Sequence, residues 1–96
     1  MLFTSCSVKP TEIDVSDLET VCDYVDAQEK CLVAYDEVMG NSKRTSELPE
    51  DQAIYARELR KKFKEIEAAA QDEFSRSECK TCPNYERMRH IALRLF

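Results

Sequence analysis

Five cysteines are the residues of this 96-residue chain with the clearest capacity for chemistry, and they stand at positions 6, 22, 31, 79 and 82. The sharpest pattern is Cys79-Lys80-Thr81-Cys82, a CxxC directly ahead of a segment that we expect to be helical. A thiolate at the start of a helix is stabilised by the helix dipole, which suits thiol-disulfide exchange. The thioredoxin arrangement, however, also needs a βαβ frame around the motif, and no strand pattern precedes it.

A structural zinc site is the second interpretation of the cysteines. Such a site needs four ligands, and His90 could replace one thiolate. Cys22 and Cys31 are nine residues apart on one predicted helix, which places them roughly 13–14 Å apart and on opposite faces. His90 lies about two helical turns beyond Cys82. These distances argue against a shared metal ion, so we expect no metal and no cofactor.

A structural disulfide is the third interpretation. Cys22 and Cys31 are too far apart to be bonded to each other, because bonded cysteines need Cα atoms within about 7 Å. In an antiparallel helical hairpin, the end of the second helix returns to the start of the first. We therefore expect a bridge from Cys22 to Cys79 or to Cys82, closing a loop of about 60 residues that stabilises the fold by a few kcal/mol. The alternative is that all cysteines are reduced, with Cys31 an ordinary buried thiol.

Other catalytic arrangements find little support. The chain has one histidine, which leaves few general acid–base or Ser–His designs. Its one glycine, Gly40, cannot form a Gly-rich phosphate-binding loop. The carboxylates of the N-terminal half stand at solvent-facing helical positions. The sequence therefore predicts that the protein is not an enzyme.

The residues that surround these cysteines predict an all-α fold. One glycine and three prolines are too few for a fold with many tight turns. A first helix is expected at residues 16–39, because Ser16 and Glu19 match a capping box and Gly40 suits a helix C-terminus. Gln28 and Glu29 interrupt its apolar stripe. The stripe itself follows 3–4 spacing: Leu18, Val21, Cys22, Val25, Leu32, Tyr35, Val38 and Met39.

A second helix is predicted at residues 49–76, with Pro49 in its first turn. A third, shorter helix is predicted at 83–95, after a break at 75–82. Residues 1–13 are expected to be a flexible leader, and 14–96 a single helical domain. The loop at 41–48 is short, so the two long helices should form an antiparallel, rod-like hairpin. We expect the third helix to cover one end of it.

The charges are divided unevenly along the chain. Residues 1–56 carry twelve acids against four bases, whereas residues 57–96 carry ten bases against seven acids. This division predicts that an acidic helix lies against a basic one, and the net charge of −5 argues against a nucleic-acid partner. A basic strip on the second helix could instead recruit an acidic partner or anionic lipid headgroups: Arg57, Arg60, Lys61 and Lys64.

Residues 2–7, Leu-Phe-Thr-Ser-Cys-Ser, resemble the end of a bacterial lipoprotein signal peptide, the lipobox. The resemblance implies that Cys6 is the lipidated residue and that the chain is a truncated form of a longer precursor. It also implies the cell envelope, an oxidising location, in preference to the cytoplasm. No window holds about 18 apolar residues, so no transmembrane segment is expected, and only lipidated Cys6 would anchor the chain to a membrane.

These observations favour a non-catalytic interaction or structural module. The expected partner is another protein or a second copy of the chain, bound through apolar residues left exposed along the hairpin. The candidates are Tyr35, Val38 and Met39 at one end, and Tyr85 and Phe96 at the other. A small envelope lipoprotein with a disulfide-stabilised helical domain is the alternative, and a thiol-redox or zinc protein using the CxxC is the third.

Overall fold

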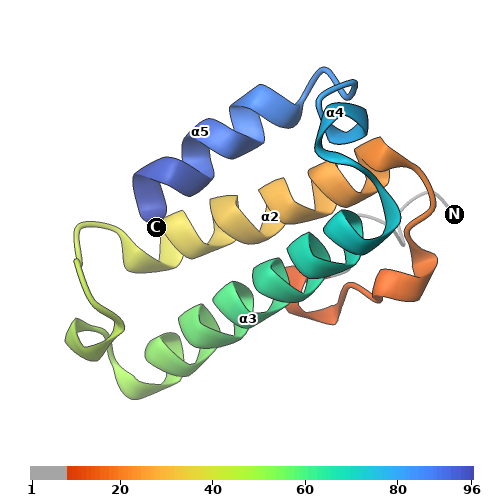
Figure 1. Cartoon of the computed structure of the whole chain (residues 1–96). Coiled ribbons are helices and arrows are strands. Elements are labelled where there is room, and N and C mark those ends of the chain that lie inside the picture. Colours follow the sequence, from red (N-terminus) through yellow and green to blue (C-terminus); the bar gives the residue numbers. More distant parts are fainter. Residues whose placement is uncertain (1–8) are drawn as a thin grey trace, which may run out of the picture.

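Three long helices form most of the protein (Figure 1), whose computed structural model describes residues 9–96. They are α2 (Val21–Met39), α3 (Glu50–Glu73) and α5 (Tyr85–Leu95). The single-turn helix α4 (Arg76–Cys79) precedes α5, and three 3-10 turns complete the described chain: η1 (Pro10–Glu12), η2 (Val15–Asp17) and η3 (Thr45–Glu47). No strand occurs within residues 9–96, and the predicted all-α class is confirmed.

Helices α2 and α3 lie side by side and run in opposite directions (Figure 1). At one end Tyr35 and Met39 of α2 pack on Ala56 and Leu59 of α3. Toward the other end lies a larger apolar cluster, which α5 also joins: Tyr24, Val25, Ala27, Cys31, Leu32, Phe63, Ile66, Ala70, Cys82 and Met88. The predicted helical hairpin is therefore confirmed, and its core follows the apolar stripes of both helices.

Helix α2 begins five residues later than the sequence predicted. Asp14 Oδ1 accepts hydrogen bonds from both the amide and the hydroxyl of Ser16, at 3.0 and 2.7 Å. Ser16 therefore lies in η2 and does not cap a helix. Thr20 is the cap instead: its hydroxyl accepts the Asp23 amide proton at 3.1 Å, and the Asp23 carboxylate accepts the Thr20 amide proton at 3.0 Å.

The second helix ends at Glu73, not at residue 76, because a competing capping box follows it. The Ser75 hydroxyl accepts the Glu78 amide proton at 3.2 Å, and Glu78 Oε1 accepts the Ser75 amide proton at 2.9 Å. Phe74 adopts an extended conformation, so the chain leaves the axis of α3 and starts α4. The third helix likewise begins at Tyr85, two residues after the predicted start.

Helix α5 runs parallel to α2 and lies along much of its length. Two ion pairs with the same sequence separation fix this direction: Arg87 Nε lies 2.7 Å from Glu29, and Arg94 Nη2 lies 3.3 Å from Asp36. The expectation that the third helix covers only one end of a rod is therefore wrong. The principal extents are 38 × 34 × 20 Å, so the molecule is flat and broad where a rod was expected.

Of the two acids that pair with α5, Glu29 is the more buried: its side chain is 15% exposed, whereas that of Asp36 is 39% exposed. It accepts hydrogen bonds from Arg87 and from Asn84, and Asn84 also donates to Asp26 at 3.0 Å. Burial raises the pKa of Glu29, but the hydrogen bonds and the charge of Arg87 outweigh it and hold the pKa below its ordinary value. The interruption of the apolar stripe at Gln28 and Glu29 is thus the place where α5 docks.

The expected leader divides into two parts. Residues 1–8, including Cys6, lie outside the described residues. Residues 9–13 follow the surface of the hairpin, where η1 contacts both α2 and α3 and Ile13 packs on the larger apolar cluster. At the opposite end of α2, Gly40 takes a φ of +54° and ends the helix at the predicted position.

Candidate functional site

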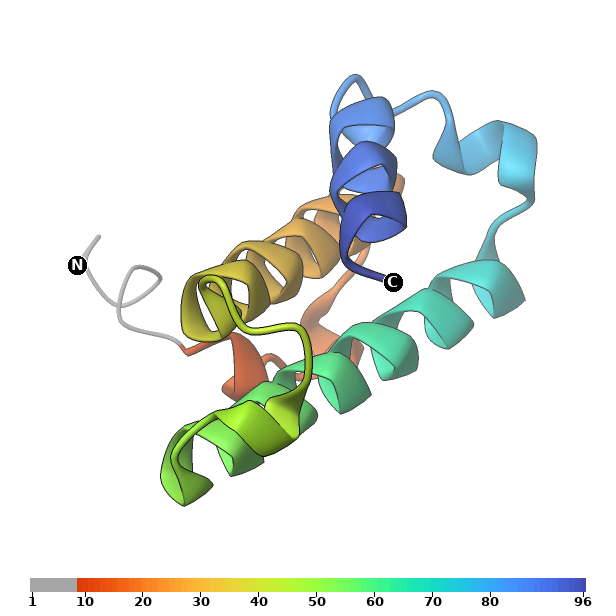
Figure 2. The same ribbon diagram turned by 90° about the vertical axis from the view of Figure 1, so that its left-hand side faces the viewer.

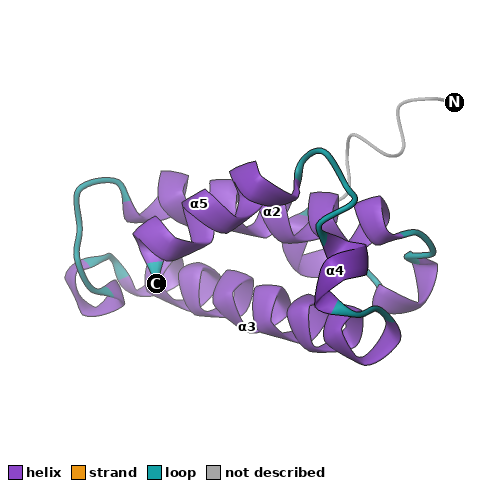
Figure 3. Cartoon of the chain, turned by 45° about the horizontal axis from the view of Figure 1, so that its top comes forward, coloured by secondary structure: helices purple, strands orange, loops and turns teal. Residues whose placement is uncertain are grey.

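An open groove runs between α3 and α5, with α2 as its floor, and we name it the α3–α5 groove. Its volume is about 610 Å³. Val25 and Gln28 form the floor, Phe63 and Ala70 lie on the α3 side, and Ala92 lies on the α5 side. Residues of α4 and the turn after it close one end (Figure 3).

The groove exists because α2 packs on both flanking helices while α3 and α5 pack little on each other. Figure 2 shows the three helices at the corners of a triangle, with α5 tilted away from α3. Small side chains face the space at Ala70 and Ala92, so neither flank fills it. This geometry resembles a four-helix bundle with its fourth position vacant.

The walls combine apolar surface with charged rims. Leu93 stands on the α5 rim with 67% of its surface exposed, the largest exposure of any bulky apolar residue described. Glu86 and Glu67, the two lining carboxylates, lie near bases one turn away: Arg89 at 3.8 Å and Lys64 at 3.9 Å. The groove therefore offers apolar and polar surface together, between rims whose acids lie near bases.

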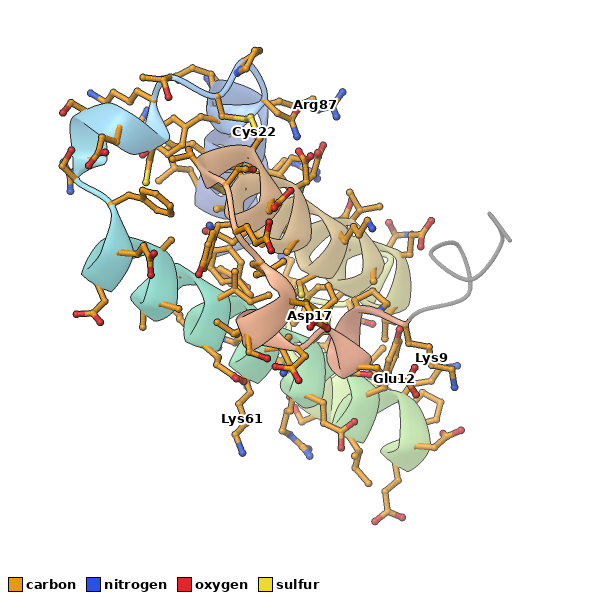
Figure 4. The ribbon with its side chains drawn as sticks, turned by 90° about the vertical axis from the view of Figure 1, so that its right-hand side faces the viewer. Lys9, Glu12, Asp17, Cys22, Lys61 and Arg87 are labelled. Carbon is orange, nitrogen blue, oxygen red and sulfur yellow. A yellow bond between two sulfur atoms is a disulfide. The ribbon has the colours of Figure 1, made fainter. Side chains whose placement is uncertain are left out.

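Phe96 lies where the groove approaches the α2–α3 loop end of the hairpin. Its ring contacts the rings of Tyr35 and Phe63 edge-on or tilted, at centroid distances of 5.3 and 5.5 Å. Arg60 and Lys64 extend over the same ring, at 4.9 and 5.8 Å from its centroid. Two bases of the predicted strip thus stand beside the groove, whereas Lys61 extends away from it (Figure 4).

Gln28 is a polar residue in an otherwise apolar floor. Its side chain is 5% exposed and donates from Nε2 to the Tyr24 carbonyl oxygen at 3.2 Å. Among residues 9–96 its Oε1 accepts no hydrogen bond, although it is not sealed from solvent. One acceptor at the base of the groove is therefore free to receive a donor.

The predicted interaction residues fall into three groups. Tyr35 and Met39 were expected to be exposed, but both are buried at 7% against α3, so this part of the prediction is wrong. Val38 is half-buried at the same end. Tyr85 lines the groove and Phe96 is 43% exposed beside it. The sequence analysis missed Leu93. It could have been found as a large apolar residue that lies outside the core-facing stripe of the third helix.

The structure joins Cys22 to Cys82, one of the two pairings that the sequence predicts (Figure 4). Their Cα atoms are 5.3 Å apart, within the range of disulfide geometry. Cys79 is a free, half-buried thiol on the end wall of the groove. Cys31 is fully buried, and desolvation raises the pKa of its thiol to about 11 despite the nearby Lys62 charge.

Neither a metal site nor a membrane span is found in the described chain. Residues 9–96 contain no group of three or more His, Cys, Asp or Glu side chains placed to hold a metal ion. No helix in the same range is both long enough and apolar enough to cross a bilayer.

Comparison with known proteins gives no relative for this chain: no family model, no curated protein and no solved structure matches it.

Proposed function

We propose that this protein is a non-catalytic interaction module that receives a helix of another protein in the α3–α5 groove. The observation that carries the proposal is the groove itself, which exposes apolar surface of Phe63, Met88 and Ala92 beside the exposed Leu93. Amphipathic helices bind in grooves of this kind by placing apolar side chains at i, i+3, i+4 and i+7 on the floor.

The size of the groove supports a short helical occupant. Its α5 wall is 11 residues long, which corresponds to about 16 Å or about three helical turns. A bound helix would contact α3 and α5 together and would complete the bundle opposite α2. It would also cover Leu93, whose exposure costs free energy in the unbound protein.

Photo-crosslinking tests this proposal by position. A photoreactive amino acid at Leu93, on the rim, is compared with the same residue at Val33, which is 43% exposed on α2 outside the groove. We expect a protein from the native source to be captured from position 93 and not from position 33.

The captured protein is then purified and titrated. It should bind the wild type and lose at least tenfold in affinity for Leu93→Asp, because the apolar contact is replaced by a charge that must be desolvated. Val33→Asp is the matched control and should bind like the wild type. Capture of the same proteins from both positions, no capture at all, or equal binding to both variants would contradict the proposal.

A second candidate function is that of a small envelope lipoprotein whose helical domain carries the groove. The Cys22–Cys82 pair supports it, because disulfides persist in oxidising compartments. The resemblance of residues 2–7 to a lipobox supplies the anchor, through Cys6. Intact mass of the native-source protein, with and without reductant, tests both parts: we expect a lipid adduct, and a gain of two hydrogens when the reductant breaks the Cys22–Cys82 bond. An unlipidated chain with five free thiols would exclude this function.

A further inference from the structure

Basic side chains outnumber acidic ones around the α3–α5 groove. Three bases line it, Arg76, Lys80 and Arg89, against the carboxylates of Glu67 and Glu86. Both carboxylates already lie near a base of their own helix. Arg76 and Lys80, on the end wall, form no ion pair with any described residue. The walls are thus net basic although the chain carries a net charge of −5.

The basic character continues past the lining residues. Arg60 and Lys64 extend over Phe96 beside the groove. Lys64 also pairs with Glu67 at 3.9 Å, but Arg60 forms no ion pair within residues 9–96. Unpaired bases therefore stand near both ends of the groove: Arg76 and Lys80 at α4, and Arg60 at Phe96.

We infer that the occupant of the α3–α5 groove is an acidic amphipathic helix of another protein. This inference rests on the proposed function and adds the chemistry of the partner to it. The apolar stripe of that helix contacts Val25, Phe63 and Ala92 on the floor and flanks. Its Asp and Glu side chains, one turn to either side, lie against the bases of both rims. Complementary charge of this kind speeds association and rejects like-charged competitors.

Gln28 adds a polar position to the same site. Its Oε1 is free of described partners at the base of the groove. A hydroxyl, amide or indole donor within the apolar stripe of the partner would satisfy it. A partner with only aliphatic residues there would leave this acceptor desolvated and unpaired, which costs about 1–3 kcal/mol.

A second copy of the chain fits the groove less well. The acidic helix of this protein is α2, but its apolar stripe is already buried against α3 and α5. The one large apolar residue exposed on α2 is Val33, which offers no stripe. Helix α5, in turn, presents Arg89 beside its exposed Leu93, so a second α5 would meet the basic rims with like charge.

Two synthetic helices test the inference directly. Both are cross-linked into helical form and carry the same leucine stripe with one serine, but one has glutamates on its flanks and the other lysines. Binding to the full chain is followed by fluorescence anisotropy at low and high salt. We expect the glutamate helix to bind at least tenfold more tightly than the lysine helix, and its affinity to fall as salt screens the charges.

Charge-reversal variants show whether the rims cause the preference. Arg89→Glu combined with Lys80→Glu should weaken the glutamate helix and strengthen the lysine helix. Lys61→Glu makes the same kind of change at an exposed α3 position that extends away from the groove. At about 0.15 M salt it should change neither affinity by more than about twofold, because screening confines the effect of a surface charge to its surroundings.

The failures of the two proposals are distinguishable. Equal binding of both helices, abolished by Leu93→Asp, overturns the acidic partner but leaves the groove as a helix-binding site. No binding of either helix at about 1 mM overturns both proposals. A concentration-dependent dimer of the protein alone, detected by sedimentation and lost in Leu93→Asp, assigns the groove to a second copy and overturns the acidic partner.

The CxxC motif places a free thiol beside the disulfide. Cys79 is a free thiol three residues before Cys82, which is bonded to Cys22. The Cys82 amide donates to the Cys79 carbonyl oxygen at 3.3 Å and closes a turn between them. Cα atoms at the two ends of such a turn lie within about 7 Å, the limit of disulfide geometry.

This geometry points to an internal thiol–disulfide exchange. The Cys79 thiolate attacks the Cys82 sulfur, the Cys79–Cys82 bond forms and the Cys22–Cys82 bond breaks. Cys22 leaves as a thiolate and takes up the proton that Cys79 has lost, so no oxidant or reductant is consumed. The exchange releases the start of α2 from the end wall of the groove.

Peptide mapping without reductant tests the exchange. The protein is held at about pH 8.5, near the ordinary cysteine pKa, then quenched in acid with an alkylating agent that acts at low pH. We expect two populations, one linked 22–82 with Cys79 alkylated, the other linked 79–82 with Cys22 alkylated. Cys79→Ser should give the 22–82 linkage alone. An unchanged 22–82 linkage in the wild type after a day would overturn the exchange.

Discussion

Helix α2 packs against α3 on one side and against α5 on another, and the two interfaces are built from different side chains. The α2–α3 interface buries continuous apolar stripes, with Leu32, Leu59 and Ile66 fully inaccessible. The α2–α5 interface depends more on polar anchors and a covalent link: Glu29 with Arg87, and Cys22 with Cys82. The hairpin is therefore stabilised by burial alone, whereas α5 adds polar and covalent anchors to a smaller apolar face centred on Met88.

The two interfaces therefore differ in how they respond to solution conditions. Burial acts along the whole length of the hairpin and is insensitive to pH or reductant. The anchors of α5 respond to both. We expect conditions that leave the hairpin folded to loosen α5, and with it one wall of the α3–α5 groove.

The largest effect is expected in the hairpin. Leu59→Ala removes a fully buried side chain that packs on Tyr35 and Met39. The free energy of unfolding should fall by about 2–5 kcal/mol, the range for such cavities. Urea unfolding monitored by circular dichroism measures this loss of stability.

The control for this substitution is Ile54→Ala, at an exposed position of the same helix. It should change stability by less than about 0.5 kcal/mol, as surface substitutions usually do. Equal losses would show that the hairpin is not held by burial.

Removal of the covalent link should have the next largest effect. Replacing both Cys22 and Cys82 by serine opens the loop between them, whose ends have a sequence separation of 60. Loss of a link across a loop of this length should cost about 2–4 kcal/mol. Reductant added to the wild type should give a similar shift. Hydrogen exchange should quicken in α5 before it quickens in α2 and α3. Uniform loss of protection across the three helices would contradict the distinction between the interfaces.

A smaller effect is expected from the polar anchor. Glu29→Ala removes the acceptor of Arg87, which is itself largely exposed, and of Asn84. The protein should be destabilised by about 1–2 kcal/mol, because a hydrogen-bonded charge with an exposed partner contributes modestly. Differential scanning calorimetry measures the change in Tm. Glu37→Ala, an exposed acid on the same helix, serves as the control and should leave the Tm unchanged.

The same anchor gives a pH dependence. The pKa of Glu29 is lowered from its ordinary value of 4.5 in the folded protein. Its contribution is therefore complete above that value and is lost as the pH falls through the lowered pKa. Urea unfolding over this acidic range should show a shallower decline in Glu29→Gln than in the wild type. Parallel declines would mean that Glu29 is not coupled to folding.

The smallest effect is expected at the far end of α5. Arg94→Ala breaks the ion pair with Asp36. The Arg94 side chain is 61% exposed and that of Asp36 is 39% exposed. Exposed pairs contribute little, so stability should change by less than about 1 kcal/mol. A loss as large as that of Glu29→Ala, measured by the same calorimetry, would show that α5 is anchored evenly along its length.

The apolar periodicity was sufficient to predict the hairpin, because each long helix buries one stripe. It could not fix the start of α2, since Ser16-x-x-Glu19 and Thr20-x-x-Asp23 both match a capping box. Asp14 decides between them, because its carboxylate accepts hydrogen bonds from the amide and the hydroxyl of Ser16, which therefore cannot cap the helix. The end of α3 depends in the same way on a local bond, the one between Ser75 and Glu78.

The candidate site was harder to predict than the fold. Antiparallel geometry narrowed the disulfide to Cys22 with Cys79 or Cys82, because the chain must return to the start of the first helix, but it did not choose between the two. The groove depends instead on the direction and tilt of α5, which are fixed by long-range contacts with α2. Among them are the ion pairs of Arg87 with Glu29 and of Arg94 with Asp36. Tyr35 and Met39 looked available as an interaction surface only because periodicity does not say how much of a stripe a partner helix covers.

The Cys22–Cys82 link also determines how the molecule would respond to a pulling force. Tension applied at the two ends of the chain passes through the sulfur–sulfur bond and bypasses everything between these residues, whose sequence separation is 60. Fully extended, the bypassed chain would span roughly 200 Å, all of it hidden from the applied load. Stretched in an oxidised state, the molecule would release only α5 and the segment before α2, and the full contour length would appear only after reduction.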